Sequence, residues 1–400
     1  MTTPAPAERR ALLPASRHGR ECARRRRTRR AATAGARQQY TQFATGCPNI
    51  DAGPAATQPL FDRRFRRADP VMSARRRSAM SVPLEEHVRR FIQRAAATDP
   101  FPSGARFGSS EAADHLQRMR SRVRPPRVSD PIDRVLELRT SAGTAVRVYV
   151  PASEDSGRVL LVYLHGGGWV SGDLDMHDPT CRSLAIGADA VVVNVDYRLA
   201  PEHPYPAPLD DAAEAVAWAI AHAESWGADP ARTVVAGTSA GANLAAAVAV
   251  RRAEAVVEPA LLGQVLIYPV LDAAMQTASH REKADSYFLT ADHLRFFWDA
   301  YVQSDVDRAH PQISPGLAPD VSQLPPAVVV SAEHDPLRDE ADAFAERMRS
   351  VGRLLAHSQV PGQIHGFLTA FADSPASTST LRVVIDGLVR MRTLPTDRAS

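Results

Sequence analysis

The sequence is poor in lysine, in cysteine and in long apolar runs, and each shortage argues against a class of protein. Lys283 is the only lysine, so arginine carries almost all of the positive charge. The three cysteines, Cys22, Cys47 and Cys181, have spacings that match neither a disulfide framework nor a zinc site. No stretch approaches the roughly 18 apolar residues that span a membrane, and no signal-peptide run follows the N-terminal arginines. We therefore expect free thiols in a reducing compartment and a cytoplasmic protein, neither secreted nor membrane-spanning.

What is present is close to the usage of an ordinary globular protein. Hydrophobic residues make up 44% and charged residues 23% of the 400 residues, which is enough to bury a sizeable core. The net charge of +3 hides a strong asymmetry along the chain. Residues 1–80 hold 18 arginines against 5 acidic residues, a local balance of +13, and the remaining residues sum to −10.

Residues 1–80 show no sustained hydrophobic period, and a segment of this composition cannot offset its ordering entropy by burial. We predict a disordered, arginine-rich extension before a folded domain at 81–395. Three origins stay open: a tail for nucleic acid or anionic surfaces, an organelle transit peptide, and translated sequence upstream of a start at Met72 or Met80. We favour an incidental extension, because arginine is preferred along the whole chain. No nucleic-acid-reading module is recognisable, so no specific nucleic-acid partner is expected.

Downstream of the extension, the hydrophobic period changes along the chain. Apolar residues at helical spacing predict helices at 84–97 and 111–120. Two short β-branched runs flank the turn 141–143 and predict a hairpin. Continuous apolar strands separated by helices predict an α/β fold, with a mostly parallel central sheet and helices on both faces. The strands are expected at 159–164, 190–195, 233–236, 263–268 and 327–331, with helical patterns such as 210–223 and 240–252 between most of them.

The pentapeptide Gly237-Thr238-Ser239-Ala240-Gly241 stands between the predicted strand 233–236 and an alanine-rich helical run. An acyl-transfer nucleophile needs this context, because a sharp turn lifts its hydroxyl above the sheet and glycine tolerates the crowding at the flanks. The pattern G-x-S-x-G alone is weak, since about one chain in ten of this length contains it by chance. Its position makes Ser239 the candidate nucleophile.

A second glycine-rich segment, His165-Gly166-Gly167-Gly168-Trp169, closes the predicted strand 159–164. Glycine lets backbone N–H groups approach the oxyanion of a tetrahedral intermediate without obstruction by a Cβ atom. Removing one such donor costs about 2.7 to 4 kcal/mol of transition-state stabilisation. We therefore interpret the segment as one side of an oxyanion hole rather than as an ordinary glycine-rich turn.

Candidates for the acid and the base follow later in the chain. Asp335 lies just past the predicted strand 327–331, and the carboxyl ends of parallel strands meet at one edge of the sheet. His365 lies 30 residues after Asp335 and completes the order serine, acid, histidine that the α/β-hydrolase fold requires. We assign Asp335 as the acid and His365 as the base.

Other charged residues, histidines and a cysteine receive a structural interpretation. The histidines lack the paired spacing and the carboxylates of a metal site, so no metal is expected. Asp339 and Glu340, which follow the acid, are expected to begin the next helix, where negative charge is favourable. The residues concerned are Cys181, His177, His203, His293, Glu333, His334, Asp339 and Glu340.

Five segments together resemble the hormone-sensitive lipase family of bacterial esterases, also called esterase family IV, which has the α/β-hydrolase fold. They are HGGGW at 165–169, DYRLAPEHPYPAP at 196–208, GTSAGAN at 237–243, DPLRDE at 335–340 and IHGF at 364–367. The resemblance implies that Gly167, Gly168 and Ala240 supply the oxyanion hole. It also places the family's acid and base positions on Asp335 and His365.

The resemblance further implies a helical cap over the site, formed by helices at about 84–125 and by an insertion at about 271–326. The insertion includes five aromatic residues that we consider as candidates, and aromatic residues at helical spacing are more often packing than pocket lining. We expect a minority of them to line the pocket. They are Tyr287, Phe296, Phe297, Trp298 and Tyr301.

These features predict a serine carboxylesterase that hydrolyses short- to medium-chain carboxylic esters through an acyl-enzyme, without a cofactor. Two alternatives stay open: an amidase or deacetylase of a specific metabolite on the same triad, and a non-catalytic ligand-binding relative. The second is weaker, because such relatives typically lose the catalytic histidine, whereas His365 is present. The expected partner is a small-molecule ester, and a homodimer stays open.

Overall fold

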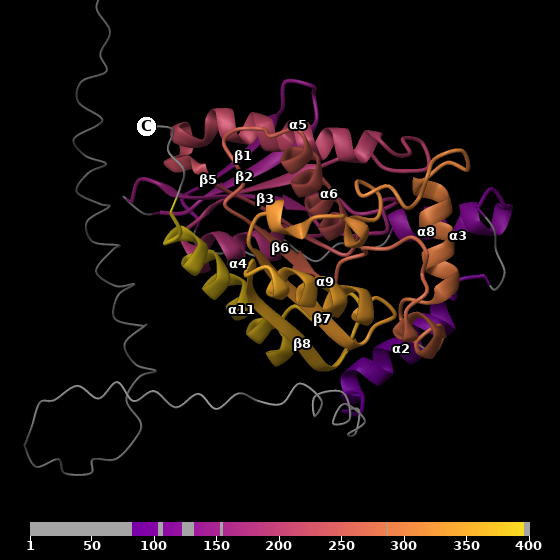
Figure 1. Ribbon diagram of the computed structural model, residues 1–400. Helices are drawn as coiled ribbons and strands as arrows, with labels where there is room; N and C mark the ends of the chain where they lie inside the picture. Colours follow the sequence, from indigo (N-terminus) through magenta and orange to yellow (C-terminus); the bar gives the residue numbers. More distant parts are fainter. Residues whose placement is uncertain (1–81, 103–106, 122–131, 153–154, 286, 396–400) are drawn as a thin grey trace, which may run out of the picture. The chain divides into compact units, whose positions relative to one another are not determined.

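The computed structural model describes residues 82–102, 107–121, 132–152, 155–285 and 287–395 (Figure 1). The predicted extension 1–80, and with it Cys22 and Cys47, lies outside these residues. Within the described ranges, no helix is long and apolar enough to cross a membrane.

A single sheet runs through the described part of the chain. Its strands are β1 (Arg134–Arg139), β2 (Ala145–Val150), β3 (Arg158–Leu164), β4 (Val191–Asp196), β5 (Ala228–Thr238), β6 (Gly263–Ile267), β7 (Ala327–His334) and β8 (Leu354–Ile364). Their order across the sheet is β1-β2-β4-β3-β5-β6-β7-β8. β2 pairs antiparallel with β1 and β4, and all the other pairs are parallel. Parallel neighbours need crossover connections, which is why helices separate most of these strands along the chain.

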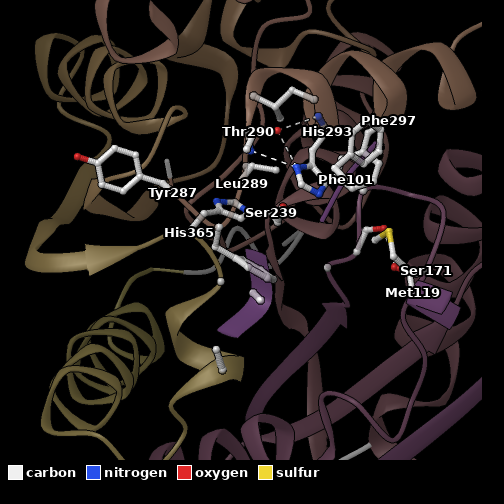
Figure 2. A pocket seen from close by; sticks show the side chains of 18 of the residues that line it. Phe101, Met119, Ser171, Ser239, Tyr287, Leu289, Thr290, His293, Phe297 and His365 are labelled. Carbon is white, nitrogen blue, oxygen red and sulfur yellow. Dashed lines mark hydrogen bonds between the residues drawn. The ribbon is translucent and has the colours of Figure 1, made fainter. Parts of the chain in front are cut away.

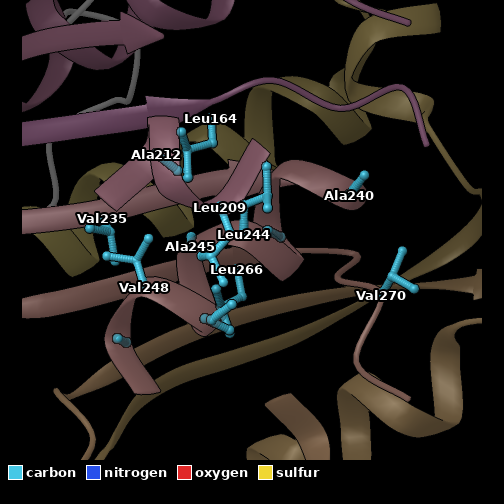
Figure 3. Close-up of a cluster of buried hydrophobic side chains, with 14 of the residues drawn as sticks. Leu164, Leu209, Ala212, Val235, Ala240, Leu244, Ala245, Val248, Leu266 and Val270 are labelled. Carbon is cyan, nitrogen blue, oxygen red and sulfur yellow. The ribbon is translucent and has the colours of Figure 1, made fainter. Parts of the chain in front are cut away.

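Helices cover both faces of this sheet. They are α4 (Asp178–Ala188) and α11 (Pro375–Arg392) on one face, and α5 (Ala207–His222), α6 (Ala240–Glu254) and α9 (Arg338–Ser350) on the other. Successive residues of a strand point to opposite faces, so Tyr163 of β3 packs with Leu184 of α4, whereas Leu164 packs on the other side. Figure 3 shows Leu164 there, with Leu209 of α5 and Leu244 of α6. Burial on both faces explains why these strands are continuously apolar.

A helical cap lies at the carboxyl ends of the parallel strands. It contains α2 (Glu86–Thr98), α3 (Ser110–Arg120) and α8 (Ala291–Tyr301), which lie together beside the sheet in Figure 1. The short helix α7 (Ala278–Glu282) leads into α8. Phe91 of α2, Met119 of α3 and Phe297 of α8 line one cavity together with Gly167, just after β3, and Ser239, just after β5. The helices fall within the segments 84–125 and 271–326 in which the cap is predicted.

The predicted α/β fold, with its mostly parallel sheet and helical cap, is confirmed. The predicted helices 84–97 and 111–120 correspond to α2 and α3, with ends shifted by a few residues. By contrast, β8, α4 and α11 have no counterpart among the predicted elements. The remaining short elements are η1 (Ala223–Trp226), η2 (Pro315–Leu317), η3 (Val321–Gln323) and α10 (Phe367–Ala370).

Candidate active site

The glycine-flanked serine occupies a sharp turn between β5 and α6. Ser239 has φ 53° and ψ −122°, a backbone conformation that residues other than glycine rarely adopt. Gly241 packs so closely on β3 that a Cβ atom there would overlap the carbonyl group of Leu164. A larger residue at 241 would push α6 away from the sheet. The turn therefore depends on this glycine, and it presents Ser239 at the carboxyl edge of the strands.

Three side chains from separate loops meet at this edge. Asp335 follows β7 and His365 follows β8, so both leave the sheet at the same end as Ser239. Nδ1 of His365 lies 2.7 Å from Oδ2 of Asp335, and Nε2 lies 2.8 Å from Oγ of Ser239. Figure 2 shows the imidazole of His365 beside Ser239. The structure thus brings together the three residues that the sequence proposes as nucleophile, acid and base.

Asp335 is placed to fix the tautomer of the imidazole. It is fully buried, and its Oδ1 accepts the N–H of Leu337 at 2.9 Å. An ionised carboxylate only accepts hydrogen bonds, so Nδ1 of His365 carries the proton that faces Asp335. Nε2 is then free to accept from the hydroxyl of Ser239, which is what a general base requires. The ring of Tyr268 packs edge to face on the imidazole, with ring centroids 4.9 Å apart, and holds its orientation.

The glycine-rich segment after β3 lies beside the serine. Gly167 and Gly168 line the same cavity as Ser239. The carbonyl oxygen of Gly167 accepts the N–H groups of Val170 and Ser171 at 3.2 and 3.0 Å, which closes a tight turn. Ala240, the third residue that the resemblance assigns to the oxyanion hole, begins α6 directly after Ser239 and is fully buried.

Two buried histidines support the glycine-rich segment from behind. Nε2 of His177 accepts the N–H of Gly166 at 3.3 Å, and its Nδ1 lies 3.1 Å from the hydroxyl of Tyr163. Nδ1 of His165 lies 2.9 Å from the carbonyl oxygen of Gly166. Burial lowers the pKa of His177 to about 3 and that of His165 to about 4, so both stay neutral near neutral pH. The structural interpretation of His177 agrees with these contacts, but nothing in the sequence points to its bond with the segment 165–169.

Carboxylates near the acid fasten the cap segments to the sheet. Glu333 accepts the N–H groups of Val82 and Gly362, each at 2.9 Å. Glu340 accepts the N–H of Leu271 at 2.8 Å, and burial raises the pKa of this carboxyl well above its ordinary range. Glu333 thus has the supporting role that the sequence predicts for it. Glu340 lies in the first turn of α9 as predicted, but its buried carboxyl accepts the N–H of Leu271 instead of serving as a negative charge at the helix start. Among the described residues, no group of three or more His, Cys, Asp or Glu side chains could hold a metal ion.

A cavity of about 640 Å³ extends from Ser239 to the cap. Its cap side combines aromatic rings with aliphatic residues and with acidic side chains such as Asp99 and Asp292. Figure 2 shows Phe101 and Phe297 near Ser239.

Of the five candidate aromatic residues, Tyr287 and Phe297 line the cavity, which agrees with the expected minority. Phe288, a sixth aromatic residue of the insertion that the prediction does not include, lines it too. The other three candidates are buried in packing, and they are Phe296, Trp298 and Tyr301.

Fold and site together define a class of protein. A mostly parallel sheet, a serine at a strand-to-helix elbow, and an acid and a histidine that follow it in the chain are the features of an α/β hydrolase. A family model described as the alpha/beta hydrolase fold matches residues 161–369, and the chain belongs to this family. The predicted resemblance to the hormone-sensitive lipase branch is confirmed.

Relatives with assigned activities are similar over most of the folded domain. The carboxylesterase NlhH of Mycobacterium tuberculosis is 40% identical over 278 residues, which cover 66% of this chain and 86% of that protein. An ethyl acetate hydrolase of Pseudomonas putida is 36% identical over 259 residues, covering 64% of this chain and 81% of that protein. Among solved structures, a thermostable esterase from Pseudomonas putida has a TM-score of 0.68 at 31% identity, over 79% of this chain and 100% of that one.

Proposed function

We propose that this protein is a serine carboxylesterase that hydrolyses short- to medium-chain carboxylic esters through an acyl-enzyme intermediate. One observation carries the proposal: Ser239, His365 and Asp335 form a continuous hydrogen-bonded chain with separations of 2.8 and 2.7 Å, at the wall of a cavity. Such a chain raises the nucleophilicity of a serine hydroxyl, and it has no role in holding a fold together. The named relatives include a carboxylesterase and an ethyl acetate hydrolase, which supports ester hydrolysis as the reaction.

The first half of the reaction acylates the serine. Oγ of Ser239 attacks the ester carbonyl carbon while Nε2 of His365 takes the hydroxyl proton. The negative charge that develops on the carbonyl oxygen is stabilised by backbone N–H groups, for which we propose Gly167, Gly168 and Ala240. The bond to the alcohol oxygen then breaks, and His365 gives its proton to the leaving alcohol.

The second half of the reaction releases the acid. A water molecule attacks the acyl carbon, and its proton passes to Nε2 of His365. The same N–H groups stabilise the second oxyanion, and the bond between Ser239 and the acyl group breaks as His365 returns the proton to Oγ. In both halves, the negative charge of Asp335 stabilises the imidazolium and keeps its Nδ1 proton in place.

The cavity supports a preference for esters of limited size. About 640 Å³ is an ordinary volume for a small-molecule site, and most of the lining surface is apolar. Acyl chains of a few carbons bury their apolar surface there. Longer chains must fold back or leave carbon in water, so catalytic efficiency is expected to fall for them.

A panel of chromogenic substrates tests the reaction class. It contains p-nitrophenyl esters of increasing acyl length, the matching anilides, and acetylated metabolites. We expect the highest kcat/KM on esters of a few carbons, with slow or no turnover of anilides. Fast anilide cleavage would favour the amidase alternative, and binding without any turnover would favour a ligand-binding relative. Activation by an oil interface with long-chain triglycerides would contradict the substrate range.

Two further expectations belong to this proposal. We propose a reducing, cytoplasmic compartment because Cys181, the cysteine within the described residues, is a buried free thiol. We propose a small-molecule ester as the partner. Light scattering of the purified protein would show whether it forms a homodimer.

A further inference from the structure

The glycine-rich segment that carries two of the proposed oxyanion donors contains an unusual backbone. Gly167, Gly168 and Trp169 have φ values of 124°, 63° and 61°, so three consecutive residues lie in the region that favours glycine. The third is tryptophan, for which a positive φ is a genuine outlier. Such a conformation persists only where the surrounding structure holds it in place.

Two aromatic side chains of the cap hold Trp169. Its ring, which is 1% exposed, stacks on Tyr301 with centroids 4.4 Å apart and planes 3° apart. It also packs on Trp298 at 4.6 Å and 45°. Both partners belong to α8. Phe297, also on α8, packs against Gly168, the residue before Trp169. A Cβ atom on Gly168 would lie only 2.6 Å from Cγ of Phe297.

Residues 196–208, one of the five segments that carry the family resemblance, fix backbone groups on either side of the loop. The hydroxyl of Tyr197 donates to the carbonyl oxygen of His165 at 2.8 Å, and the two rings stack 4.1 Å apart. At the other end, the N–H of Ala200 donates to the carbonyl oxygen of Trp169 at 2.9 Å.

The same segment also holds the cap helix that stacks on Trp169. The N–H of Tyr205 donates to the carbonyl oxygen of Tyr301 at 2.7 Å. From α3, Nε of Arg120 donates to the carbonyl oxygen of Val170 at 2.8 Å, the residue after Trp169. The loop 165–169 is therefore fixed at both ends by the sheet domain and on its outer side by the cap.

We propose that Trp169, Tyr301 and Trp298 are positioning residues for the oxyanion hole. Tyr301 and Trp298 stack on the ring of Trp169 and keep this residue at a positive φ. The loop conformation that results holds the N–H groups of Gly167 and Gly168 toward the carbonyl oxygen of the substrate. Without the stack, the loop relaxes toward negative φ and turns these N–H groups away. Trp169 lines the cavity, whereas Tyr301 and Trp298 lie outside its lining and act through the loop. The inference rests on the proposed esterase function and extends it, because it makes the oxyanion hole depend on the docking of α8.

The test compares Tyr301→Leu with two matched variants. Tyr301→Phe retains the ring and so retains the stack. Phe296→Leu removes a different buried aromatic ring from the same helix, one that does not line the cavity. Each variant is assayed with p-nitrophenyl butyrate for kcat and KM, and its thermal midpoint is measured. A wild-type protein without activity would refute the proposed function itself, before any comparison of variants.

We expect Tyr301→Leu to lower kcat about tenfold to hundredfold with KM changed by less than about threefold, since a misplaced donor weakens only transition-state binding. Tyr301→Phe should remain within about twofold of the wild type in kcat, and Phe296→Leu should lower the thermal midpoint more than it lowers kcat. Trp298→Phe, a milder change, should also lower kcat. This variant tests the inference if Tyr301→Leu does not fold.

A boronic acid inhibitor separates positioning from a general loss of packing. Oγ of Ser239 forms a covalent bond to the boron atom while the hydroxyl proton passes to His365. The tetrahedral boronate anion that results occupies the oxyanion hole. The inhibition constant for Tyr301→Leu should weaken by about the factor by which kcat/KM falls, while Phe296→Leu leaves it unchanged. An active, folded Tyr301→Leu with unchanged kcat and unchanged boronate affinity would overturn the inference.

Discussion

The two sides of the cavity are built in different ways. On the sheet side, Ser239, Asp335 and His365 leave the ends of parallel strands, and hydrogen bonds of 2.7 and 2.8 Å fix their relative positions. On the cap side, α2 and the connection between α7 and α8 contribute aromatic rings that pack on one another, such as Phe91 and Phe288 with centroids 5.1 Å apart. Hydrogen bonds define one geometry, whereas ring packing tolerates several. We propose that the sheet side, together with the glycine-rich loop that Tyr301 and Trp298 hold in place, governs the chemical step, and that the cap rings that line the cavity govern which esters are accepted.

The largest effect is expected on the sheet side, from removal of the nucleophile. Ser239→Ala should lower kcat by about 10⁴-fold or more, since only binding and the oxyanion hole remain. The fold should survive, because the hydroxyl makes a single described side-chain contact, with His365. Steady-state hydrolysis and the thermal midpoint of the variant check both statements. Activity near the wild-type level would exclude Ser239 as nucleophile.

A somewhat smaller effect is expected from the acid. Asp335→Asn should lower kcat about 10²-fold to 10⁴-fold, because the amide favours the wrong tautomer of His365. Asp339→Asn is the matched control, since this carboxylate accepts the N–H of Ser279 and does not contact His365. If Asp339→Asn proved the more damaging change in kcat, the assignment of the acid would be wrong.

A change on the cap side should alter selectivity instead. Phe288→Ala enlarges the cavity, so the ratio of kcat/KM for a hexanoate ester to that for an acetate ester should rise about threefold to tenfold. The kcat on the acetate ester should change little. Phe107→Ala is the control, because Phe107 is a 43% exposed cap residue outside the cavity lining. A hundredfold loss of kcat with no change in the ratio would break the division between the two sides.

The buried histidines behind the glycine-rich segment make stability depend on pH. Burial lowers the pKa of His165 to about 4 and that of His177 to about 3, against 6.5 for an ordinary histidine. Between these lowered pKa values and 6.5, the unfolded chain binds more protons than the folded protein. The free energy of unfolding therefore falls as the pH drops through this range. At about pH 5 the loss relative to neutral pH should be roughly 2 kcal/mol for each histidine.

Urea unfolding between about pH 5 and pH 7 measures this slope. His177→Gln should remove part of it, because glutamine does not titrate. Equal slopes in the wild type and in His177→Gln would mean that folding does not lower the pKa of His177.

The smallest effect is expected from the arginine-rich extension. A chain that begins at Met80 should keep its kcat/KM on a butyrate ester and its thermal midpoint, since every proposed catalytic residue lies far downstream. Its formal charge changes from +3 to −10, so weak, salt-sensitive adhesion to anionic surfaces should disappear. A large loss of activity or of stability in the shorter chain would show that the extension belongs to the folded unit.

The sequence predicts the sheet side of the site better than the cap side, for a physical reason. Ser239 stands in a local pattern, a strand followed by a glycine-flanked turn and a helix, and the parallel sheet fixes where the ends of β7 and β8 lie. By contrast, the approach of Phe91 to Phe288, and of Trp169 to Tyr301, joins residues that are far apart in the chain. No local period encodes such contacts.

Missed elements have similar explanations. The strand β8 contains His357, Ser358, Gln359 and Pro361, and it pairs only with β7 at the sheet edge. An edge strand is partly exposed and tolerates polar residues and proline, so it lacks the continuous apolar run that reveals the central strands. The role of His177 depends on a bond from Gly166, which only the folded backbone brings within reach.

Covalent labelling with diethyl p-nitrophenyl phosphate tests Ser239 as the nucleophile without any substitution of that residue. We expect Oγ of Ser239 to displace p-nitrophenolate from phosphorus, so that one equivalent of reagent abolishes esterase activity. Mass spectrometry of the digested protein should then find the diethylphosphoryl group on Ser239, and His365→Ala should react far more slowly because the proton acceptor is missing. Complete inactivation with the label on another residue, or full activity after stoichiometric labelling of Ser239, would show that Ser239 is not the nucleophile.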